Sequence, residues 1–298
     1  MTSKNSSTFS GRLFNVINYS LMTVFMIVCL YPFYYIIIYS LSDPYEISRG
    51  GVFFWPVNPT IDSYVQILSK KTVPLAFVVS ASKTVLGTVL CIYCSSLFAY
   101  LMTKREMRFR KLVYRFVIAS MYLGAGLIPW YLTMRAYGLQ NSFLLYIIPG
   151  ILNPFYVILI KTYIESIPSS MEESAEVDGA GFLKTFHRII FPLSKPIVAT
   201  VAVFSAVGIW NSWQDNFFLV SNPNLQTIQL ILYKYFNEAA LLAAELIRNP
   251  SAIKEAPKIS SQTVKMTMSV IAIVPILLVY PFMQRYFVKG IMLGAVKG

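Results

Sequence analysis

Long apolar runs separated by short polar connections make up most of this chain of 298 residues. An α-helix rises about 1.5 Å per residue, so about 20 apolar residues cross the ~30 Å hydrocarbon core of a membrane. Six runs are long enough: residues 19–41, 74–101, 112–134, 142–164, 196–219 and 264–284. The pattern therefore predicts an all-α integral membrane protein with six transmembrane helices.

The composition supports this fold class. Hydrophobic residues make up 56% of the chain and charged residues 13%, whereas soluble proteins average roughly 45–50% apolar and 25% charged residues. The net charge of +12 comes from basic residues in short loops beside the apolar runs. Basic residues in such loops orient a protein in the lipid bilayer, so no nucleic-acid partner is expected. The first run is too long for a signal-peptide core and is expected to stay as a span.

The charges of the connections predict the topology. The connection after the second run contains the basic residues Lys104, Arg105, Arg108, Arg110, Lys111 and Arg115 against the single acidic residue Glu106. Such an excess is typical of a cytoplasmic loop. By alternation, the N-terminal tail 1–18, the loop 165–195 and the C-terminal tail 285–298 lie inside, and loops 42–73 and 220–263 lie outside. Within the last of these, residues 227–247 are expected to form a helix.

The polar interval from Glu173 to Pro196 has the most regular pattern in the chain. Ser170 stands three residues before Glu173, as in a capping box, so a short helix is expected to begin there. Gly179 interrupts this helix. It should tolerate no larger side chain, either because its backbone is left-handed or because a partner surface lies too close. Glu173 either contacts a partner or stabilises the start of its own helix.

A second short helix is expected to follow, with Asp178 as its cap. Its apolar face is formed by Phe182, Phe186, Ile189 and Ile190, which recur at helical spacing. Pro192 and Pro196 should end this helix, because proline lacks the amide donor. From the pattern alone, a docking element and a capped helix pair lying on the membrane surface both remain open.

These residues resemble a known motif. The order Glu173-Ser174-Ala175, then Asp178-Gly179-Ala180, Phe186 and Pro192, is similar to the EAA loop of ABC importer permeases, with Ser174 where alanine is usual. The last fifteen residues, QRYFVKGIMLGAVKG, are similar to the C-terminal signature of permeases in maltose-type carbohydrate importers. The resemblance covers nearly all of the chain from the first run onward and comes closest to permeases of complex-saccharide systems.

The resemblance implies a type I ABC importer permease with a transmembrane domain 19–284 and cytoplasmic termini, in the cytoplasmic membrane of a bacterium. It implies five partners: a second homologous permease, two copies of an ATPase subunit, an extracytoplasmic solute-binding protein and an oligosaccharide substrate. The loop 165–195 would couple the ATPase to the membrane helices. The residues implied at that contact are Glu173, Ala175, Asp178, Gly179, Ala180, Phe186 and Pro192.

Polar side chains inside the apolar runs are candidates for the substrate pathway, because placing them in lipid is costly. Lys83 is the deepest charge, and a pore-lining role and a structural role both stay open for it. The other candidates are Asn153, Trp210, Asn211 and Trp213. Amides beside aromatic rings are typical of sugar sites and equally of the aromatic belts at membrane interfaces.

The sequence lacks the motifs of a membrane enzyme. No Gly-Lys dipeptide occurs, so there is no P-loop to bind a nucleotide. His187 is the only histidine, and Cys29, Cys91 and Cys94 lie in predicted spans, so a catalytic triad or a zinc site is not expected. We therefore expect no catalytic residue, metal or cofactor. An ion-gradient-driven carrier or a channel without an ATPase is the alternative, although no span contains a convincing acidic residue for ion coupling.

Overall fold

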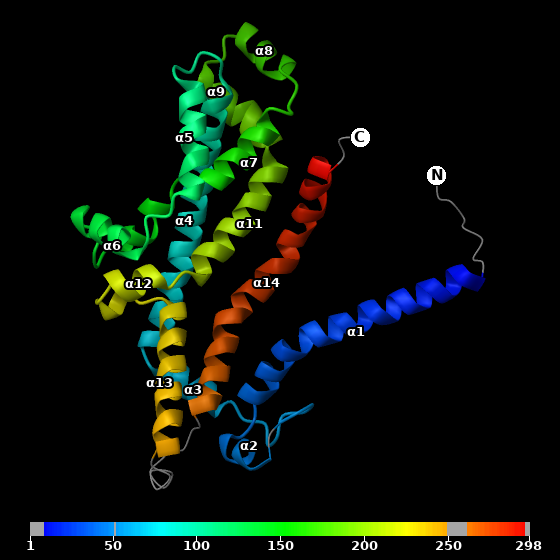
Figure 1. The fold of residues 1–298 in the computed structure, drawn as a ribbon, viewed down its shortest axis with the longest axis vertical. Helices are drawn as coiled ribbons and strands as arrows, with labels where there is room; N and C mark the ends of the chain where they lie inside the picture. Colours follow the sequence, from blue (N-terminus) through cyan, green and yellow to red (C-terminus); the bar gives the residue numbers. More distant parts are fainter. Residues whose placement is uncertain (1–8, 51, 249–260, 296–298) are drawn as a thin grey trace. The chain divides into compact units, whose positions relative to one another are not determined.

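The computed structural model describes residues 9–50, 52–248 and 261–295, and every regular element in these ranges is helical (Figure 1). The long helices are α1 Phe9–Ser40, α4 Thr72–Thr103, α11 Lys195–Asn211, α13 Ile228–Arg248 and α14 Ser261–Ala295. The shorter ones are α2 Pro44–Gly50, α3 Asp62–Ser69, α5 Arg110–Tyr122, α6 Leu127–Ala136, α7 Pro154–Ile164, α8 Ser170–Val177, α9 Phe182–Thr185, α10 Phe191–Leu193 and α12 Gln214–Leu219. The predicted all-α fold class is confirmed for these residues.

The chain divides into two compact units, residues 1–69 with 235–271 and residues 70–234 with 272–298. In the first unit a small core forms where α1 ends and the following loop returns to it. The buried side chains of this core are Ile38, Tyr39, Ile47 and Val52. The candidate site residues all belong to the second unit.

In the second unit, α4 packs along α7 and α11 (Figure 1). Gly87 allows α4 and α11 to approach closely, because a Cβ at this position would lie only 3.0 Å from Cδ1 of Ile209. The main core of the unit joins these three helices to the π-helix Phe186–Ile190. Its buried members are Ala99, Tyr100, Met102, Val157, Ile160, Ile164, Phe186, Ile190 and Val201. The segment 182–193 is therefore attached to the membrane helices through their shared core.

By length and composition, three described helical segments can each cross a membrane alone: Gly11–Ser40, Thr72–Thr103 and Gln262–Pro281. Two bent pairs pass the same test as single spans. They are Phe143–Gly150 with Pro154–Ile164, bent by 43°, and Phe182–Leu193 with Lys195–Asn211, bent by 80°. The described residues thus hold up to five candidate spans, and the predicted total of six stays a prediction.

The predicted run 112–134 differs from the structure. It is divided between α5, which ends at Tyr122, and α6, which begins at Leu127. Gly126 between them has φ +80, a conformation that favours glycine. The apolar count of the run alone did not reveal this break.

The two predicted tails are partly helical. Helix α1 begins at Phe9, inside the predicted tail 1–18, because the apolar sequence starts before the run that defined the span. Helix α14 continues to Ala295 through most of the predicted tail 285–298. The expected helix 227–247 matches α13, whereas residues 249–260 of the predicted outer loop 220–263 lie outside the described residues.

Candidate functional site

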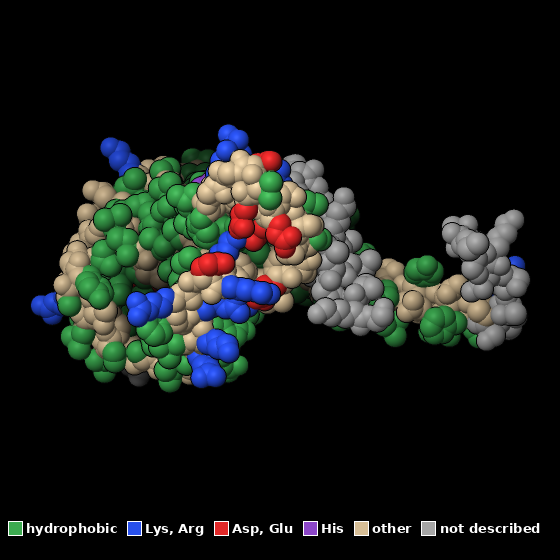
Figure 2. All heavy atoms as spheres, turned by 90° about the horizontal axis from the view of Figure 1, so that it is seen from above, with side chains coloured by type: hydrophobic (Ala, Val, Ile, Leu, Met, Phe, Trp, Pro, Cys, Tyr) green, Lys and Arg blue, Asp and Glu red, His purple; other side chains and the backbone are tan. Residues whose placement is uncertain are grey.

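Residues 170–193, here called the helical hairpin, lie at one end of the second unit (Figure 1). Figure 2 looks onto the end that carries α8 and shows acidic and basic side chains gathered on it. The predicted start of α8 at Ser170 is confirmed, but the predicted capping box is wrong. Ser169 is the N-cap without a side-chain bond, and the Ser170 carbonyl accepts a hydrogen bond from Ser174 Oγ at 2.8 Å. Glu173 lies in the first turn of α8, where an acidic side chain is favourable.

Gly179 reverses the chain after α8. Its φ is +71, so the left-handed backbone that was one of two explanations for this glycine is confirmed. A Cβ at Gly179 would meet no other atom of the described chain within 4 Å. Asp178 is the C-cap of α8, and α9 begins after Gly181, so the prediction that Asp178 caps the second helix is wrong. The left-handed residue that follows Asp178 turns the chain before a second helix can start there.

The second helix of the hairpin does not end at Pro192. Helix α9 continues through the π-helix Phe186–Ile190 into α10, which contains Pro192. Pro196, also predicted to end this helix, instead lies in the first turn of α11. The wider π turn before Pro192 shifts the carbonyl that the proline ring would meet in a regular α-helix, so the ring is accommodated.

Three of the predicted coupling residues, Glu173, Asp178 and Gly179, are exposed on the hairpin. Val177 beside them is 88% exposed. An exposed surface of this kind can contact another subunit without rearranging the chain.

Two other predicted coupling residues, Ala175 and Phe186, are buried. The ring of Phe186 lies 5.6 Å from the ring of Tyr100 on α4 and 5.6 Å from that of Phe191. Phe186 therefore attaches the hairpin to the membrane helices. Its predicted contact with a partner stays a prediction.

A hollow of about 580 Å³ brings together residues of α8 and of the segment 180–193. Its lining includes Ala175, Asp178, Ala180 and Pro192, four residues that the sequence singled out, together with the basic side chains of Lys184 and Arg188. The hairpin thus gathers the motif residues into one surface with a shallow, partly basic depression.

Lys104 has a contact that sequence reasoning missed, because the sequence indicated only its membership of a basic loop. Its Nζ lies 2.7 Å from Glu172 Oε2 and 3.7 Å from Glu176 Oε1, both on α8. Burial alone would lower the pKa of Lys104, but the hydrogen bond to Glu172 raises it above its ordinary value. The lysine is therefore charged at physiological pH. A pair separated by this much sequence leaves no local pattern to detect.

Lys83 is fully buried in α4 and is bonded to the chain break between α11 and α12. Its Nζ donates to the carbonyl oxygen of Ser212 at 2.7 Å and to Ser212 Oγ at 2.9 Å. It also lies 5.3 Å from the centre of the Tyr146 ring. A cation at the C-terminus of a helix is favourable, so the structure supports the structural interpretation of Lys83. Its predicted place in the substrate pathway stays a prediction.

Asn153 and Trp210, two further pathway candidates, have structural partners. Asn153 is the N-cap of α7, and its Oδ1 accepts from the backbone amides of Phe155 and Tyr156. Trp210 is buried, and its Nε1 donates to the carbonyl of Ala272 at 3.0 Å. Both side chains therefore stabilise the helices that hold them.

Asn211 and Trp213 lie on either side of Ser212, at the break. Asn211 is exposed, and its Oδ1 accepts from Gln229 Nε2 at 3.2 Å. The Trp213 ring stacks on Tyr233 with 4.2 Å between the ring centres. The structure thus brings an accessible amide and an aromatic stack together at an interruption of the helix, as in many sugar-binding sites.

The helical arrangement is that of a type I ABC importer permease. The structure matches a chain from the crystal structure of a bacterial ABC transporter involved in the import of the acidic polysaccharide alginate. The TM-score is 0.82 at 30% sequence identity, over 94% of this chain and 98% of that one. The family model of the binding-protein-dependent transport system inner membrane component matches residues 2–293. The chain belongs to this family and is an ABC permease subunit.

Two relatives from Bacillus subtilis (strain 168) are similar over nearly their full length. Protein LplC is 35% identical over 98% of this chain and 97% of its own. The polygalacturonan/rhamnogalacturonan transport system permease protein YtcP is 33% identical over 97% of this chain and 99% of its own. The predicted membership of the carbohydrate-importer permeases is confirmed.

Proposed function

We propose that this chain is the permease subunit of an ATP-driven importer and that its helical hairpin couples it to an ATPase. The observation that supports this most directly is the construction of the hairpin. Its tip, with Glu173, Val177 and Gly179, is exposed, while Phe186 lies in the core shared with the membrane helices. A segment built in this way can receive a displacement at its surface and pass it to the helices that it packs against.

The importer would contain a second homologous permease, two ATPase subunits and an extracytoplasmic binding protein that delivers the substrate. The hairpin and both termini would face the cytoplasm of a bacterial cell, with six spans crossing the plasma membrane. The basic residues between α4 and α5 support this orientation. Since the sequence has no P-loop, ATP hydrolysis would take place in the partner subunits.

The substrate would be an oligosaccharide. Two similar proteins support this class by their names. YtcP is named as the permease of a polygalacturonan/rhamnogalacturonan transport system, and the transporter in the crystal structure is described as involved in the import of alginate. Exposed Asn211 and stacked Trp213 offer a hydrogen-bonding group and an aromatic surface of the kind that sugars contact. Oligogalacturonate and alginate oligomers are therefore the first substrates to test, with raffinose as a neutral comparison.

The experiment that tests this proposal compares Gly179→Asp with Gly138→Asp. Both glycines follow a helix with positive φ, +71 and +68, and a Cβ at either would meet no described atom within 4 Å. An aspartate therefore strains the backbone similarly at both sites, by about 1–2 kcal/mol. We expect Gly179→Asp to insert into the membrane but to abolish ATP-dependent uptake and the co-purification of an ATPase. Gly138→Asp should retain both.

Two outcomes contradict the proposal. If neither variant changes uptake and the wild type purifies without an ATPase or a second permease, an ion-driven carrier or a channel becomes the better explanation. If Gly179→Asp fails to insert while Gly138→Asp inserts, the glycine serves folding and not coupling.

A further inference from the structure

The basic residues between α4 and α5 do not all have the same surroundings. Arg105, Arg108, Lys111 and Arg115 are exposed, as expected for residues that only set the orientation in the membrane. The side chain of Lys104 is only 17% exposed, and its ammonium group lies between two carboxylates of α8. A lysine that only orients the protein in the membrane needs neither a buried side chain nor two carboxylate partners.

Lys104 stands where α4 ends. It is the C-cap of that helix, and its backbone amide donates to the carbonyl of Leu101. Its partner Glu172 lies in the first turn of α8, the exposed helix of the hairpin. Their hydrogen bond of 2.7 Å therefore connects a membrane helix directly to the element that we propose contacts the ATPase.

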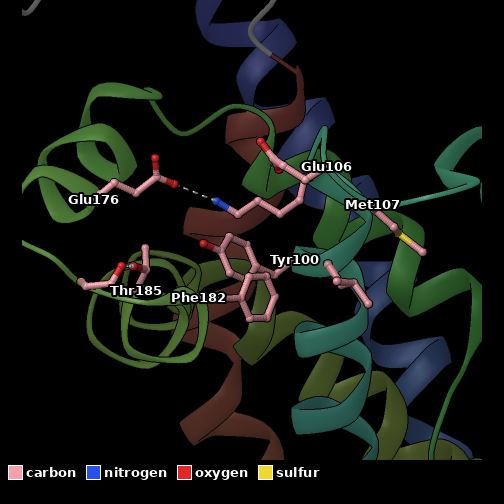
Figure 3. Close-up of a pocket in the computed structure, with 9 residues that line it drawn as sticks. Tyr100, Glu106, Met107, Glu176, Phe182 and Thr185 are labelled. Atoms are coloured by element: carbon pink, nitrogen blue, oxygen red, sulfur yellow. Dashed lines mark hydrogen bonds and ion pairs between the residues drawn. The ribbon is translucent and has the colours of Figure 1, made fainter.

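Close packing does not make this connection. A hollow of about 350 Å³ lies at the junction. Its lining includes Tyr100 and Lys104 at the end of α4, Glu176 from α8, Ala180 from the connection, and Phe182 and Thr185 from α9. Figure 3 shows this hollow, and its dashed line that ends on Glu176 marks the longer of the two ion pairs. Few atoms of α4 and α8 pack against each other beside a hollow, so dispersion contacts contribute little there. The charged pair therefore sets the distance between the two elements.

The second helix of the hairpin is joined to α4 by different chemistry. The rings of Tyr100 and Phe182 lie against one another (Figure 3), stacked with their centres 4.7 Å apart. Tyr100 itself is fully buried. Lys104 lies over the same ring, with its Nζ 4.8 Å from the ring centre. The two helices of the hairpin therefore meet α4 at adjacent points, one through aromatic stacking and the other through the ion pair.

We propose that Lys104 is a positioning residue that ties α8 to the end of α4, so that a displacement of the hairpin moves this membrane helix. The inference rests on the proposed function, because it concerns how the same hairpin transmits motion. Loss of the tie leaves the ATPase contact in place, since Glu173, Asp178 and Gly179 remain exposed on the hairpin. ATP hydrolysis then continues while less sugar moves for each ATP consumed.

The test exchanges the two charges in the complete importer, reconstituted with its partner permease, ATPase and binding protein. Lys104→Glu, Glu172→Lys and the double exchange are compared for ATPase rate and for uptake of labelled oligogalacturonate. We expect each single variant to lower the uptake per ATP by about tenfold, within the usual range of coupling between sites. The double exchange should restore most of the ratio, because the ion pair is rebuilt in the opposite direction.

The pair Lys161 and Glu165 is the matched control. It has the same 2.7 Å separation, but both residues are near the end of α7, four positions apart. Lys161 also lies 4.7 Å from the centre of the Tyr114 ring on α5, as Lys104 lies 4.8 Å from that of Tyr100. Reversing these charges removes an ion pair and a ring contact without affecting α8, so the uptake per ATP should stay at the wild-type value. Lys104→Gln, which adds no repulsion, tests the same loss of the tie if Lys104→Glu inserts poorly.

The results separate the two proposals. If uptake depends on ATP but the Lys104 variants keep the wild-type uptake per ATP, the proposed role of Lys104 is wrong and the proposed function stands. A double exchange that is no better than either single variant also overturns it. A wild-type chain that takes up oligogalacturonate without any ATPase overturns the proposed function itself.

Discussion

At the end of the second unit that carries the helical hairpin, an ion pair joins α4 to α8, whereas at the α11–α12 break hydrogen bonds to neutral oxygens join α4 to the chain. Aromatic rings stack in both regions. Lys104 binds the carboxylate of Glu172, and Lys83 binds the carbonyl and hydroxyl of Ser212. Both lysines are contributed by α4 or its C-cap, about 30 Å apart along the helix at 1.5 Å per residue. The same residue type therefore has two different tasks, one inside α4 and one at the C-cap of this helix.

The difference follows from what each lysine is bonded to. The break is fixed from several sides: Asn216, which is buried, donates to the Tyr146 hydroxyl and accepts from the amide of Thr227. Side-chain hydrogen bonds therefore hold the break from Lys83, Tyr146 and Thr227. The hairpin is held differently: Phe186 and Ile190 belong to the core shared with α4, α7 and α11, and α8 is joined to the end of α4 by the charged pair.

The largest effect is expected from Phe186→Ala. This fully buried ring belongs to the core that joins the hairpin to α4, α7 and α11. Its removal leaves a cavity and should lower the free energy of unfolding by about 3–5 kcal/mol. Thermal unfolding in mild detergent measures the change. Val177→Ala, at an 88% exposed position of the same hairpin, is the control and should change the stability by less than about 0.5 kcal/mol. Equal effects at both positions would mean that the hairpin is not anchored by its core.

Lys83→Met should have the next largest effect. Methionine fills a similar volume but removes the two hydrogen bonds from the charged ammonium group to Ser212, and hydrogen bonds of charged groups contribute about 1.5–3 kcal/mol. We expect a lower melting temperature and reduced uptake of oligogalacturonate, because the break loses its fixed position. Lys161→Met leaves unpaired the Glu165 carboxylate, whose side chain is 44% exposed to solvent, so it should cost less, about 0.5 kcal/mol. If Lys83→Met instead keeps the wild-type stability and raises only the KM of uptake, Lys83 contacts the substrate.

Asn153→Ala should lower the stability by about 1 kcal/mol, the usual contribution of a helix cap. Asn153→Ser is the discriminating variant, because serine caps a helix about as well as asparagine but does not carry an amide. A capping role predicts that Asn153→Ser restores both stability and uptake. A substrate contact predicts restored stability with a raised KM, and would return Asn153 to the pathway.

The sequence predicted the parts of this structure that depend on local pattern. The apolar runs, the start of α8 at Ser170 and the special backbone of Gly179 all follow from residue type and spacing. The division of 112–134 into two helices was missed although Gly124 and Gly126 were visible in the run, because a hydropathy count gives glycine no weight as a helix breaker. Weighing the two glycines together with the hydropathy of the run would have predicted the break between α5 and α6.

The contacts between distant residues were not predictable in the same way. Lys104 meets Glu172, and Lys83 meets Ser212, across 68 and 129 positions of the sequence. A single sequence contains no signal for such pairs. From the sequence, a buried lysine cannot be told apart from one that only sets the orientation in the membrane. The passage of the helix through Pro192 was missed because the prediction assumed a regular α-helix, in which proline is not accommodated, and the structure has a π turn just before it.

The smallest effect on stability is expected from Asn211→Ala, and it tests whether the break presents a substrate contact. The side chain is exposed and bonded only to Gln229 among the described residues, so the free energy of unfolding should change by less than about 0.5 kcal/mol. We expect the KM for oligogalacturonate to rise while the maximal rate changes little. Gln229→Ala removes the same hydrogen bond and leaves the Asn211 amide in place, so it should leave the KM near the wild-type value. If both variants raise the KM equally, the hydrogen bond between them, and not contact of Asn211 with the sugar, is what the transport step requires.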